Sequence, residues 1–506
     1  MTFAYTYDNY GNRITMTGPM GTTTYAYDNY NRLASITDPN GKITKYTTDQ
    51  LGRRIKEELP NSITTTYSYD EISRLAGIST LNSQLSTLSS YAYGYDRVDN
   101  KTSITTQAGE HTYGYDNLYQ LTSATHPDQP AENYTYDKIG NRNPLTFKHS
   151  AWNQILEDDK YTYTYDDNGN RTERKAKDGT LRDVYTWNAE NRLIKFERYD
   201  NINATTPITT ATYKYDALGR RIEKSVIASG SEAISTRYLY DGINIIAETD
   251  GGGTITTIYT QGQGIDEPIS MTRNNTYYYH RDTLGSITSL TDETGNVVQE
   301  YRYDSFGNIT YMKDSNFIQP FTFTGREYDP ESGLYYYRER TLDPNSGTFI
   351  SSDPIGFDTG DVNLYWYVRG NPLSLIDPSG LLLGGPNAKI EMPRPQGPVI
   401  KMPPPAPPPP TLGPPQSCTM GCHPSWPKGP KPCDPPLCDW GALTTCIILV
   451  YDKDQFQLCR DVCMSIPATP PNATRVVVTT LCYLCRTAQT YQVINCFAEH
   501  CSLGGK

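Results

Sequence analysis

The feature that most constrains this chain is a short phrase, Tyr-x-Tyr-Asp, that recurs through its first half. Near the start of the chain, the aspartates that end the phrase or its worn copies stand 20 or 21 residues apart, at Asp8, Asp28, Asp49 and Asp70. A fixed period of this length is typical of repeat proteins. Clear copies occupy residues 5–8, 25–28, 67–70, 93–96, 113–116, 134–137, 163–166 and 213–216.

Each copy predicts a β-hairpin. Two tyrosines that are two residues apart lie on one face of a strand, and Asp followed by Gly-Asn or Gly-Arg is a turn sequence. A second strand rich in β-branched residues follows, as in residues 32–37. Stacked hairpins of this kind predict a mainly β fold, a continuous antiparallel sheet that coils. We interpret the repeat tyrosines and aspartates as structural.

Length and charge exclude several classes of protein. A chain of 506 residues is too long for one ordinary domain. Its net charge of −11 argues against nucleic-acid binding by the repeats, and no apolar run reaches the ~18 residues of a membrane helix. The N-terminus begins inside a repeat and has no basic-then-apolar signal pattern. We therefore expect a piece of a longer parent.

After the repeats come two phrases of one form, Asp-Pro-Ile-Gly at residues 353–356 and Asp-Pro-Ser-Gly at residues 377–380. On spacing alone, each phrase is a type I turn. A second interpretation requires the carboxylates of Asp353 and Asp377 to lie side by side. One of them would then keep its proton near neutral pH, and the pair could activate water and protonate a peptide nitrogen.

A longer run of specific residues surrounds these phrases. It consists of Tyr279-His280-Arg281-Asp282, Leu284-Gly285-Ser286, Tyr301-Arg302-Tyr303-Asp304, Phe306-Gly307, Phe323-Thr324-Gly325-Arg326, Gly333-Leu334-Tyr335-Tyr336-Tyr337-Arg338, Asn363-Leu364-Tyr365, Asn371-Pro372 and Asp377-Pro378-Ser379-Gly380-Leu381. This run resembles the core-associated region of bacterial Rhs and YD-repeat proteins, and the C component of insecticidal toxin complexes.

The resemblance implies a hollow β-shell whose paired aspartates cut the chain and leave a C-terminal toxin inside. Carried over, Asp353 and Asp377 are the catalytic pair and Leu381–Leu382 is the bond that is cut. No cofactor is implied. Ser352, which precedes the first aspartate, departs from the charged residue that is common there. The gap between the two phrases is also a little longer than in members that cut.

The resemblance also implies partners and a location. The chain's own tail is the enclosed cargo, and an immunity protein and secretion machinery are further partners. The protein is expected to be bacterial, and secreted or at the cell surface. The predicted domains are a repeat shell (1–276), a core-associated plug with the autoprotease motif (277–381), a Pro-rich linker (382–417) and a variable, Cys-rich toxin domain (418–506).

All 11 cysteines lie between Cys418 and Cys501. A disulfide-stapled module suits this concentration. Cys459 and Cys463 are four residues apart, which favours a partly helical tail. A zinc module is an alternative, with Cys482, Cys485, His500 and Cys501 as weak ligand candidates. A cysteine-dependent enzyme is a third alternative.

Two functions remain open at this point. The first is a Rhs-type toxin-delivery protein whose shell encloses an effector that is released by cleavage after Leu381. The alternative is a non-cleaving structural or adhesive cell-surface protein. Its tyrosine-rich sheet would bind carbohydrate or neighbouring cells, and its two Asp-Pro phrases would be turns only.

Overall fold

The computed structural model describes residues 2–143, 145–381 and 384. The chain divides into two compact units, residues 1–399 and 400–506, and every described residue belongs to the first. Leu382 and the predicted Cys-rich tail lie outside the described residues. The weak zinc candidates Cys482, Cys485, His500 and Cys501 also lie outside them, and so does the predicted helical character of the tail.

The described residues form three antiparallel sheets, in which each strand pairs with the next strand along the chain. The first sheet has 13 strands: β1 (Ala4–Tyr7), β2 (Arg13–Gly18), β3 (Gly21–Tyr27), β4 (Leu33–Thr37), β5 (Ile43–Thr48), β6 (Arg54–Glu58), β7 (Thr64–Tyr69), β8 (Leu75–Leu81), β9 (Thr87–Tyr95), β10 (Lys101–Thr106), β11 (Gly109–Tyr115), β12 (Leu121–Thr125) and β13 (Glu132–Asn133).

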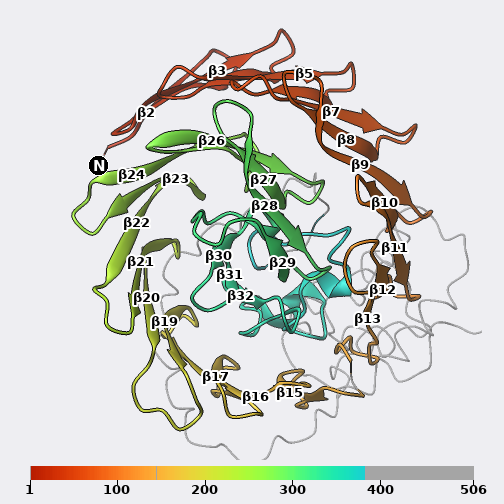
Figure 1. The fold of residues 1–506 in the computed structure, drawn as a ribbon, viewed down its shortest axis with the longest axis vertical. Coiled ribbons are helices and arrows are strands. Elements are labelled where there is room, and N and C mark those ends of the chain that lie inside the picture. Colours follow the sequence, from red (N-terminus) through yellow and green to blue (C-terminus); the bar gives the residue numbers. More distant parts are fainter. Residues whose placement is uncertain (1, 144, 382–383, 385–506) are drawn as a thin grey trace, which may run out of the picture. The chain divides into compact units, whose positions relative to one another are not determined.

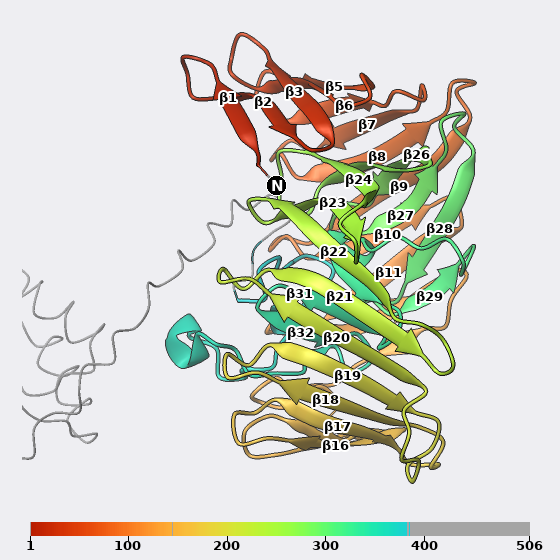
Figure 2. The ribbon, with the colours of Figure 1, turned by 90° about the vertical axis from the view of Figure 1, so that its left-hand side faces the viewer.

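The second sheet has 16 strands: β14 (Lys148–His149), β15 (Ile155–Glu157), β16 (Tyr161–Tyr165), β17 (Arg171–Ala176), β18 (Arg182–Trp187), β19 (Leu193–Tyr199), β20 (Thr209–Tyr215), β21 (Arg221–Ala228), β22 (Ile234–Asp241), β23 (Asn244–Asp250), β24 (Ile255–Gln261), β25 (Pro268–Arg273), β26 (Asn275–Arg281), β27 (Ile287–Thr291), β28 (Val297–Tyr303) and β29 (Ile309–Met312). Figure 2 shows β16 to β24 side by side.

The third sheet is small and consists of β30 (Glu327–Asp329), β31 (Leu334–Tyr337), β32 (Arg340–Asp343) and β33 (Thr348–Phe349). Three short 3-10 helices complete the described elements: η1 (Phe323–Gly325), η2 (Gly356–Thr359) and η3 (Val368–Gly370). The prediction of a mainly β fold built from antiparallel hairpins is confirmed.

The aspartate of the repeat organises each turn, as predicted. Asp28 is representative: its Oδ1 accepts the backbone N–H groups of Tyr30 and Arg32 at 2.8 and 3.0 Å. Its Oδ2 accepts the Nε–H of Arg32 at 2.7 Å. Arg32 then donates from Nη1 to the carbonyl oxygen of Asp49, which belongs to the next turn, at 2.7 Å. One Asp-Arg pair therefore closes its own turn and ties it to its neighbour.

The two tyrosines of the phrase have different tasks. The first is buried against the sheet in several copies, often under a guanidinium, as Tyr163 lies beneath Arg171 with 4.3 Å between the Arg171 Cζ and the ring centroid. In six copies the second donates its hydroxyl proton to a backbone carbonyl of the preceding repeat. We call these tyrosine-to-carbonyl hydrogen bonds staples. They join Tyr27 to Arg13, Tyr69 to Arg54, Tyr95 to Leu75, Tyr115 to Lys101, Tyr165 to Ile155 and Tyr215 to Leu193, at 2.7–3.0 Å.

The expected continuous sheet is interrupted between β13 and β14. The repeat copy at residues 134–137 keeps its turn, because Asp137 Oδ1 accepts the N–H groups of Ile139 and Asn141 at 2.9 Å. Its strands shrink to one isolated bridge, Tyr136 to Arg142. Trp366 packs on Gly140 and donates its indole N–H to the Gly140 carbonyl at 2.6 Å. The segment that carries Trp366 therefore lies where this hairpin would otherwise extend.

The start of the first sheet packs face to face on the second sheet (Figure 1). Ile36 and Ile63 of the first sheet share one buried cluster with Ile246, Ile269 and Tyr278 of the second. Arg54 of β6 also reaches Glu267, which lies beside β25, at 2.6 Å. Strands β26 to β29 continue the second sheet without a break, so the predicted boundary at residue 276 coincides with no change in strand order.

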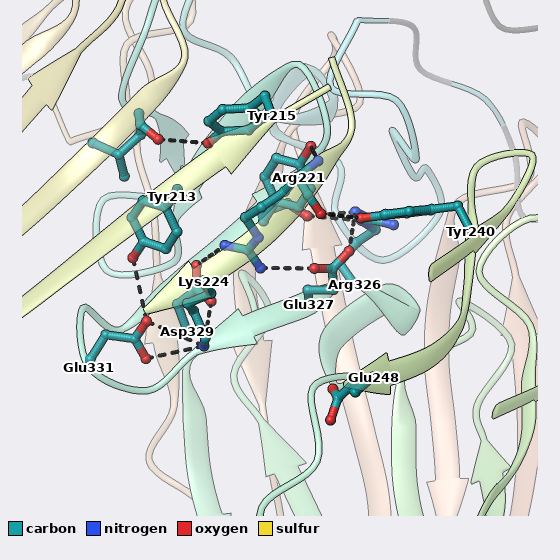
Figure 3. Close-up of polar contacts among 12 residues, drawn as sticks. Tyr213, Tyr215, Arg221, Lys224, Tyr240, Glu248, Arg326, Glu327, Asp329 and Glu331 are labelled. Atoms are coloured by element: carbon teal, nitrogen blue, oxygen red, sulfur yellow. Dashed lines mark hydrogen bonds and ion pairs between the residues drawn. The ribbon is translucent and has the colours of Figure 1, made fainter. Parts of the chain in front are cut away.

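The small third sheet lies inside the turn of the two large sheets (Figure 1). Figure 3 shows Arg221 of β21 between Glu327 and Asp329, with N–O distances of 2.8 and 2.6 Å. Lys224 adds bonds to Asp329 and Glu331 at 3.0 and 3.3 Å. Burial opposes ionisation of Asp329, but Arg221 and Lys224 hold its pKa below the ordinary value.

A second anchor joins β17 to β32. Arg171 and Asp343 lie 2.6 Å apart, and neither side chain is exposed to solvent. Because a buried charge is costly without its partner, this pair specifies where the third sheet meets the second sheet. The two anchors thus fix the small sheet whose strand β32 carries Arg340 of the candidate site.

Candidate self-cleavage site

Asp353 begins the first of two tight turns. Its carbonyl oxygen accepts the N–H of Gly356 at 3.0 Å, and its Oδ1 accepts the N–H of Ile355 at 2.9 Å. Its own N–H donates to the carbonyl of Leu364 at 2.9 Å. The turn that the sequence predicts is therefore present, and Oδ2 remains for contacts with other parts of the fold.

Asp377 begins the second turn. Its Oδ1 accepts the N–H of Leu381 at 3.0 Å and the hydroxyl of Ser379 at 3.2 Å. Gly380 completes the turn with a φ of +73°, and a Cβ at this position would lie 2.5 Å from the carbonyl oxygen of Tyr337. Glycine is therefore required here by both the backbone conformation and the space available.

The two aspartates meet at Arg340 of β32. The Nη2 atom of Arg340 lies 3.0 Å from Asp353 Oδ2 and 3.2 Å from Asp377 Oδ2. The two carboxylate oxygens therefore cannot be farther apart than these two distances together. All three side chains are at least nine-tenths buried, with exposed fractions of 4%, 8% and 4% for Arg340, Asp353 and Asp377.

The other nitrogens of Arg340 hold the backbone of both turns. Its Nη1 donates to the Leu364 carbonyl at 3.2 Å, the same carbonyl that accepts the N–H of Asp353. Its Nε donates to the Gly380 carbonyl, one residue before Leu381. One guanidinium thus aligns the two carboxylates and the end of the second turn. The planar, multiply donating geometry of arginine suits this arrangement.

Burial and neighbouring charges shift the pKa values of Asp353 and Arg340 in opposite directions. Burial raises the pKa of Asp353, with a further contribution from Asp377, and the attraction of Arg340 only partly offsets this rise. Burial also lowers the pKa of Arg340, against the attraction of the two carboxylates. Asp353 therefore keeps a proton to higher pH than an exposed aspartate does.

Backbone hydrogen bonds lie on both sides of Leu381. Ile376 and Gly384 exchange two of them, N–H to carbonyl in both directions, each 2.9 Å long. Leu381 itself donates its N–H to Asp377 as described above. The predicted cleaved bond runs from Leu381 to Leu382, and Leu382 lies outside the described residues.

The structure thus brings the buried side chains of Asp353 and Asp377 together, with the backbone N–H of half-buried Leu381 bonded to Asp377. Arg340 was not predicted from the sequence. Its alternation with Arg338 in an otherwise apolar and tyrosine-rich stretch was a usable signal, because buried arginines require acidic partners.

Over the ranges that the structure describes, no group of three or more His, Cys, Asp or Glu side chains suits a metal ion. Within the same ranges, no helix combines the length and hydropathy needed to cross a membrane.

Comparison with known proteins identifies the family. The teneurin YD-shell family matches residues 94–372, more than half of the chain, and the RHS repeat matches residues 7–43. The chain belongs to the teneurin YD-shell family. The predicted resemblance to Rhs and YD-repeat proteins is confirmed.

Several curated relatives match more than half of this chain. The tRNA nuclease WapA of Bacillus subtilis is 35% identical over 288 residues, which cover 53% of this chain and 12% of the relative. The double-stranded DNA deaminase toxin A of Burkholderia cenocepacia is 28% identical over 327 residues, which cover 57% of this chain and 22% of the relative. The chain therefore spans only a small part of these relatives.

Solved structures share the YD-shell fold. The crystal structure of TcdB2-TccC3 has a TM-score of 0.56 and 24% identity, over 75% of this chain and 22% of that chain. A Photorhabdus luminescens Tc holotoxin pore has a TM-score of 0.56 and 23% identity, over 77% of this chain and 21% of that chain. At this level of identity the likeness concerns the fold alone.

Proposed function

We propose that this chain is part of a Rhs-type toxin-delivery protein, in which the β-shell carries a C-terminal effector and frees it by cutting the chain after Leu381. The observation that carries the proposal is the buried cluster of Asp353 and Asp377 on one nitrogen of Arg340, with the Leu381 N–H on Asp377. A buried carboxylate pair that contacts the backbone N–H of Leu381 is suited to intramolecular hydrolysis.

The relatives support a delivery role for the shared region. One is named a tRNA nuclease and another a double-stranded DNA deaminase toxin, yet each matches more than half of this chain. Two different chemistries attached to one shared portion indicate that this portion does not itself carry either activity. We therefore assign residues 1–381 to delivery and residues 418–506 to the effector. We place the protein among secreted or delivered bacterial proteins.

The reaction is a hydrolysis that consumes one water molecule. Asp377, as the carboxylate, takes a proton from water while the water oxygen bonds to the Leu381 carbonyl carbon. Asp353, in its protonated form, donates its proton to the Leu382 nitrogen as the carbon–nitrogen bond breaks. The products are a carboxyl group on Leu381 and an amine on Leu382. The raised pKa of Asp353 is the reason for giving it the acid role.

Arg340 positions the two carboxylates in this scheme. Its bonds to both Oδ2 atoms and to the Gly380 carbonyl keep the pair and the second turn in register. Positioning of reacting groups contributes several kcal/mol to the rate of an intramolecular reaction. The proposal therefore requires Arg340 as well as the two aspartates.

Denaturing electrophoresis of the expressed chain tests the proposal. The wild-type chain is expected to give a body that ends at Leu381 and a separate tail, residues 382–506. Asp353→Asn and Asp377→Asn are expected to stay whole. Asp358→Asn is the matched control, because Asp358 lies between the two phrases and is exposed. A whole wild-type band, or equal cutting in all four chains, contradicts the proposal.

One observation favours the second candidate function, a non-cleaving adhesive protein. The repeat turns present large exposed side chains at corresponding positions, with Tyr10 and Tyr30 exposed by 79% and 78%. Exposed aromatic rings can stack on sugars, and exposed apolar residues commonly mark interaction surfaces. A whole wild-type chain that binds a glycan array, with binding lost in Tyr10→Ala and Tyr30→Ala, would support this function instead.

A further inference from the structure

A pair of histidines lies apart from the cleavage site, on neighbouring strands of the first sheet. His111 is in β11, and His126 directly follows β12. Thr112 and Thr125 are register partners, so the two histidines stand opposite one another across the strand pair. Their ring centroids are 5.1 Å apart with an interplanar angle of 65°.

The two rings point the same kind of nitrogen at each other. The Nδ1 atoms of His111 and His126 lie 2.8 Å apart. Only one of these nitrogens carries the proton of this contact, so the other presents its lone pair. Two imidazole nitrogens that converge in this way are a usual feature of transition-metal sites.

The Nε2 nitrogens of both histidines already make hydrogen bonds. His126 Nε2 lies 2.8 Å from Glu132 Oε1, and His111 Nε2 lies 3.3 Å from the hydroxyl of Thr106. Glu132 also accepts the backbone N–H of Ser305 at 3.1 and 3.2 Å, and the hydroxyl of Tyr134.

This outer arrangement fixes the tautomer of His126. The Glu132 oxygen accepts the proton on Nε2, so Nδ1 can act as an electron-pair donor. Metal-bound histidines commonly donate their second N–H to a carboxylate in this way.

The pair also has access to a cavity. A cavity of about 330 Å³ is lined by both histidines, and by Asp128 and Gln129. This volume has room for water molecules that complete a coordination shell. Because the described residues offer no third His, Cys, Asp or Glu at this point, the protein would supply two ligands and water the remainder.

We infer that His111 and His126 form a binding site for a divalent late transition metal, held by the two Nδ1 atoms. Two nitrogens bound to one tetrahedral zinc at about 2.0–2.1 Å are about 3.3 Å apart, so the rings need to separate by only about 0.5 Å. His111 moves its proton from Nδ1 to Nε2, where the Thr106 oxygen accepts it. The pair therefore loses no proton on binding.

The site would act as a clip at the end of the first sheet. Glu132 belongs to β13, whereas Ser305 lies two residues after the end of β28 in the second sheet. A metal on the histidines would strengthen the bond of His126 to Glu132, and through it the contact with Ser305. The ligand class is Ni²⁺, Cu²⁺ or Zn²⁺ with water, which are the metals that prefer imidazole ligands.

Calorimetric titration of the full chain with Ni²⁺, after alkylation of its cysteines, tests the inference. The other four histidines remain in both pair variants, so the readout is the difference in stoichiometry. His111→Asn and His126→Asn are each expected to lose one bound Ni²⁺ relative to the wild type. His149→Asn, in β14, is the matched control and is expected to lose none.

Glu132→Gln keeps both ligands and removes the charge behind His126. It is expected to weaken binding at the site by about 10- to 100-fold without changing stoichiometry at saturation. Circular dichroism of each variant shows whether it is folded. Equal stoichiometry in the wild type and both pair variants overturns the inference, and the pair is then a shared-proton hydrogen bond only.

Discussion

Replacing Arg340 by methionine is the most informative change at the cleavage site. The side chain keeps its approximate length and loses its charge, together with four hydrogen bonds. Two of these bonds reach the carboxylates of Asp353 and Asp377, at 3.0 and 3.2 Å. Each charge-assisted hydrogen bond contributes about 1.5–3 kcal/mol. Loss of two such bonds from the reacting arrangement is expected to slow cleavage by about 10²-fold or more.

The same change has a pH signature. Asp353 acts as the acid, so cleavage falls as pH rises through its folded-state pKa. Burial already raises that pKa and Arg340 opposes the rise. Without the guanidinium the pKa rises further, and the falling limb of the pH profile moves to higher pH. A purely structural role for Arg340 would lower the rate without moving this limb.

The assay is the fraction of chain cut with time, measured on gels across a pH series. Arg340→Lys restores a charge without the planar set of donors, and it is expected to cut at an intermediate rate. Arg369→Met is the control, since Arg369 bonds Asp361 and its side chain is 48% exposed. A wild-type rate in Arg340→Met, or an unmoved limb, refutes the reasoning.

Three further changes test the fold that supports the site. Arg221→Met leaves buried Glu327 and Asp329 without their main cation, so urea unfolding is expected to show a free energy of unfolding lower by about 3–5 kcal/mol. Adding Asp329→Asn is expected to recover part of this loss. Equal loss in the single and double variants would contradict the role of Arg221 as an anchor. Tyr95→Phe removes one staple to Leu75 and is expected to cost about 1 kcal/mol, whereas exposed Tyr10→Phe should cost almost nothing, and equal unfolding midpoints would argue against the staples. Gly380→Ala places a Cβ against the Tyr337 carbonyl at positive φ, so a strain of about 1–3 kcal/mol is expected to slow cleavage roughly tenfold or more; unchanged cutting on a gel would show that this turn does not position the bond.

The local part of the fold could be predicted because its causes are local. Tyr-x-Tyr places two rings on one face, and Asp28 with Arg32 closes a turn within five residues. Such contacts depend on sequence neighbours, so the period alone predicts the hairpins. The tie from Arg32 to Asp49 follows from the same repeat.

The long-range part could not be predicted in this way. The break in the sheet depends on Trp366 packing on Gly140, two residues that are far apart in sequence and carry no shared pattern. Ile36 and Ile246 share a buried cluster that joins the two large sheets, and the strands of both sheets have the same repeat pattern in sequence. Local periodicity gives the strands but not their partners across the core.

The candidate site shows the same division. Each Asp-Pro phrase predicts a turn, and both turns are present. Only the family resemblance suggested that the two turns meet, and neither spacing nor resemblance pointed to Arg340. The guanidinium lies on β32, and its position depends on the anchors from Arg171 and Arg221 to the inner sheet.

The most direct test of self-cleavage is mass spectrometry of the chain ends after purification in water enriched in ¹⁸O. Hydrolysis at the proposed bond predicts a tail that begins at Leu382 and a body whose C-terminal Leu381 carboxyl carries one ¹⁸O atom. Both products should be absent in Asp353→Asn and Asp377→Asn. An uncut wild-type chain, ends at other residues, or the same ends in the aspartate variants would contradict the account.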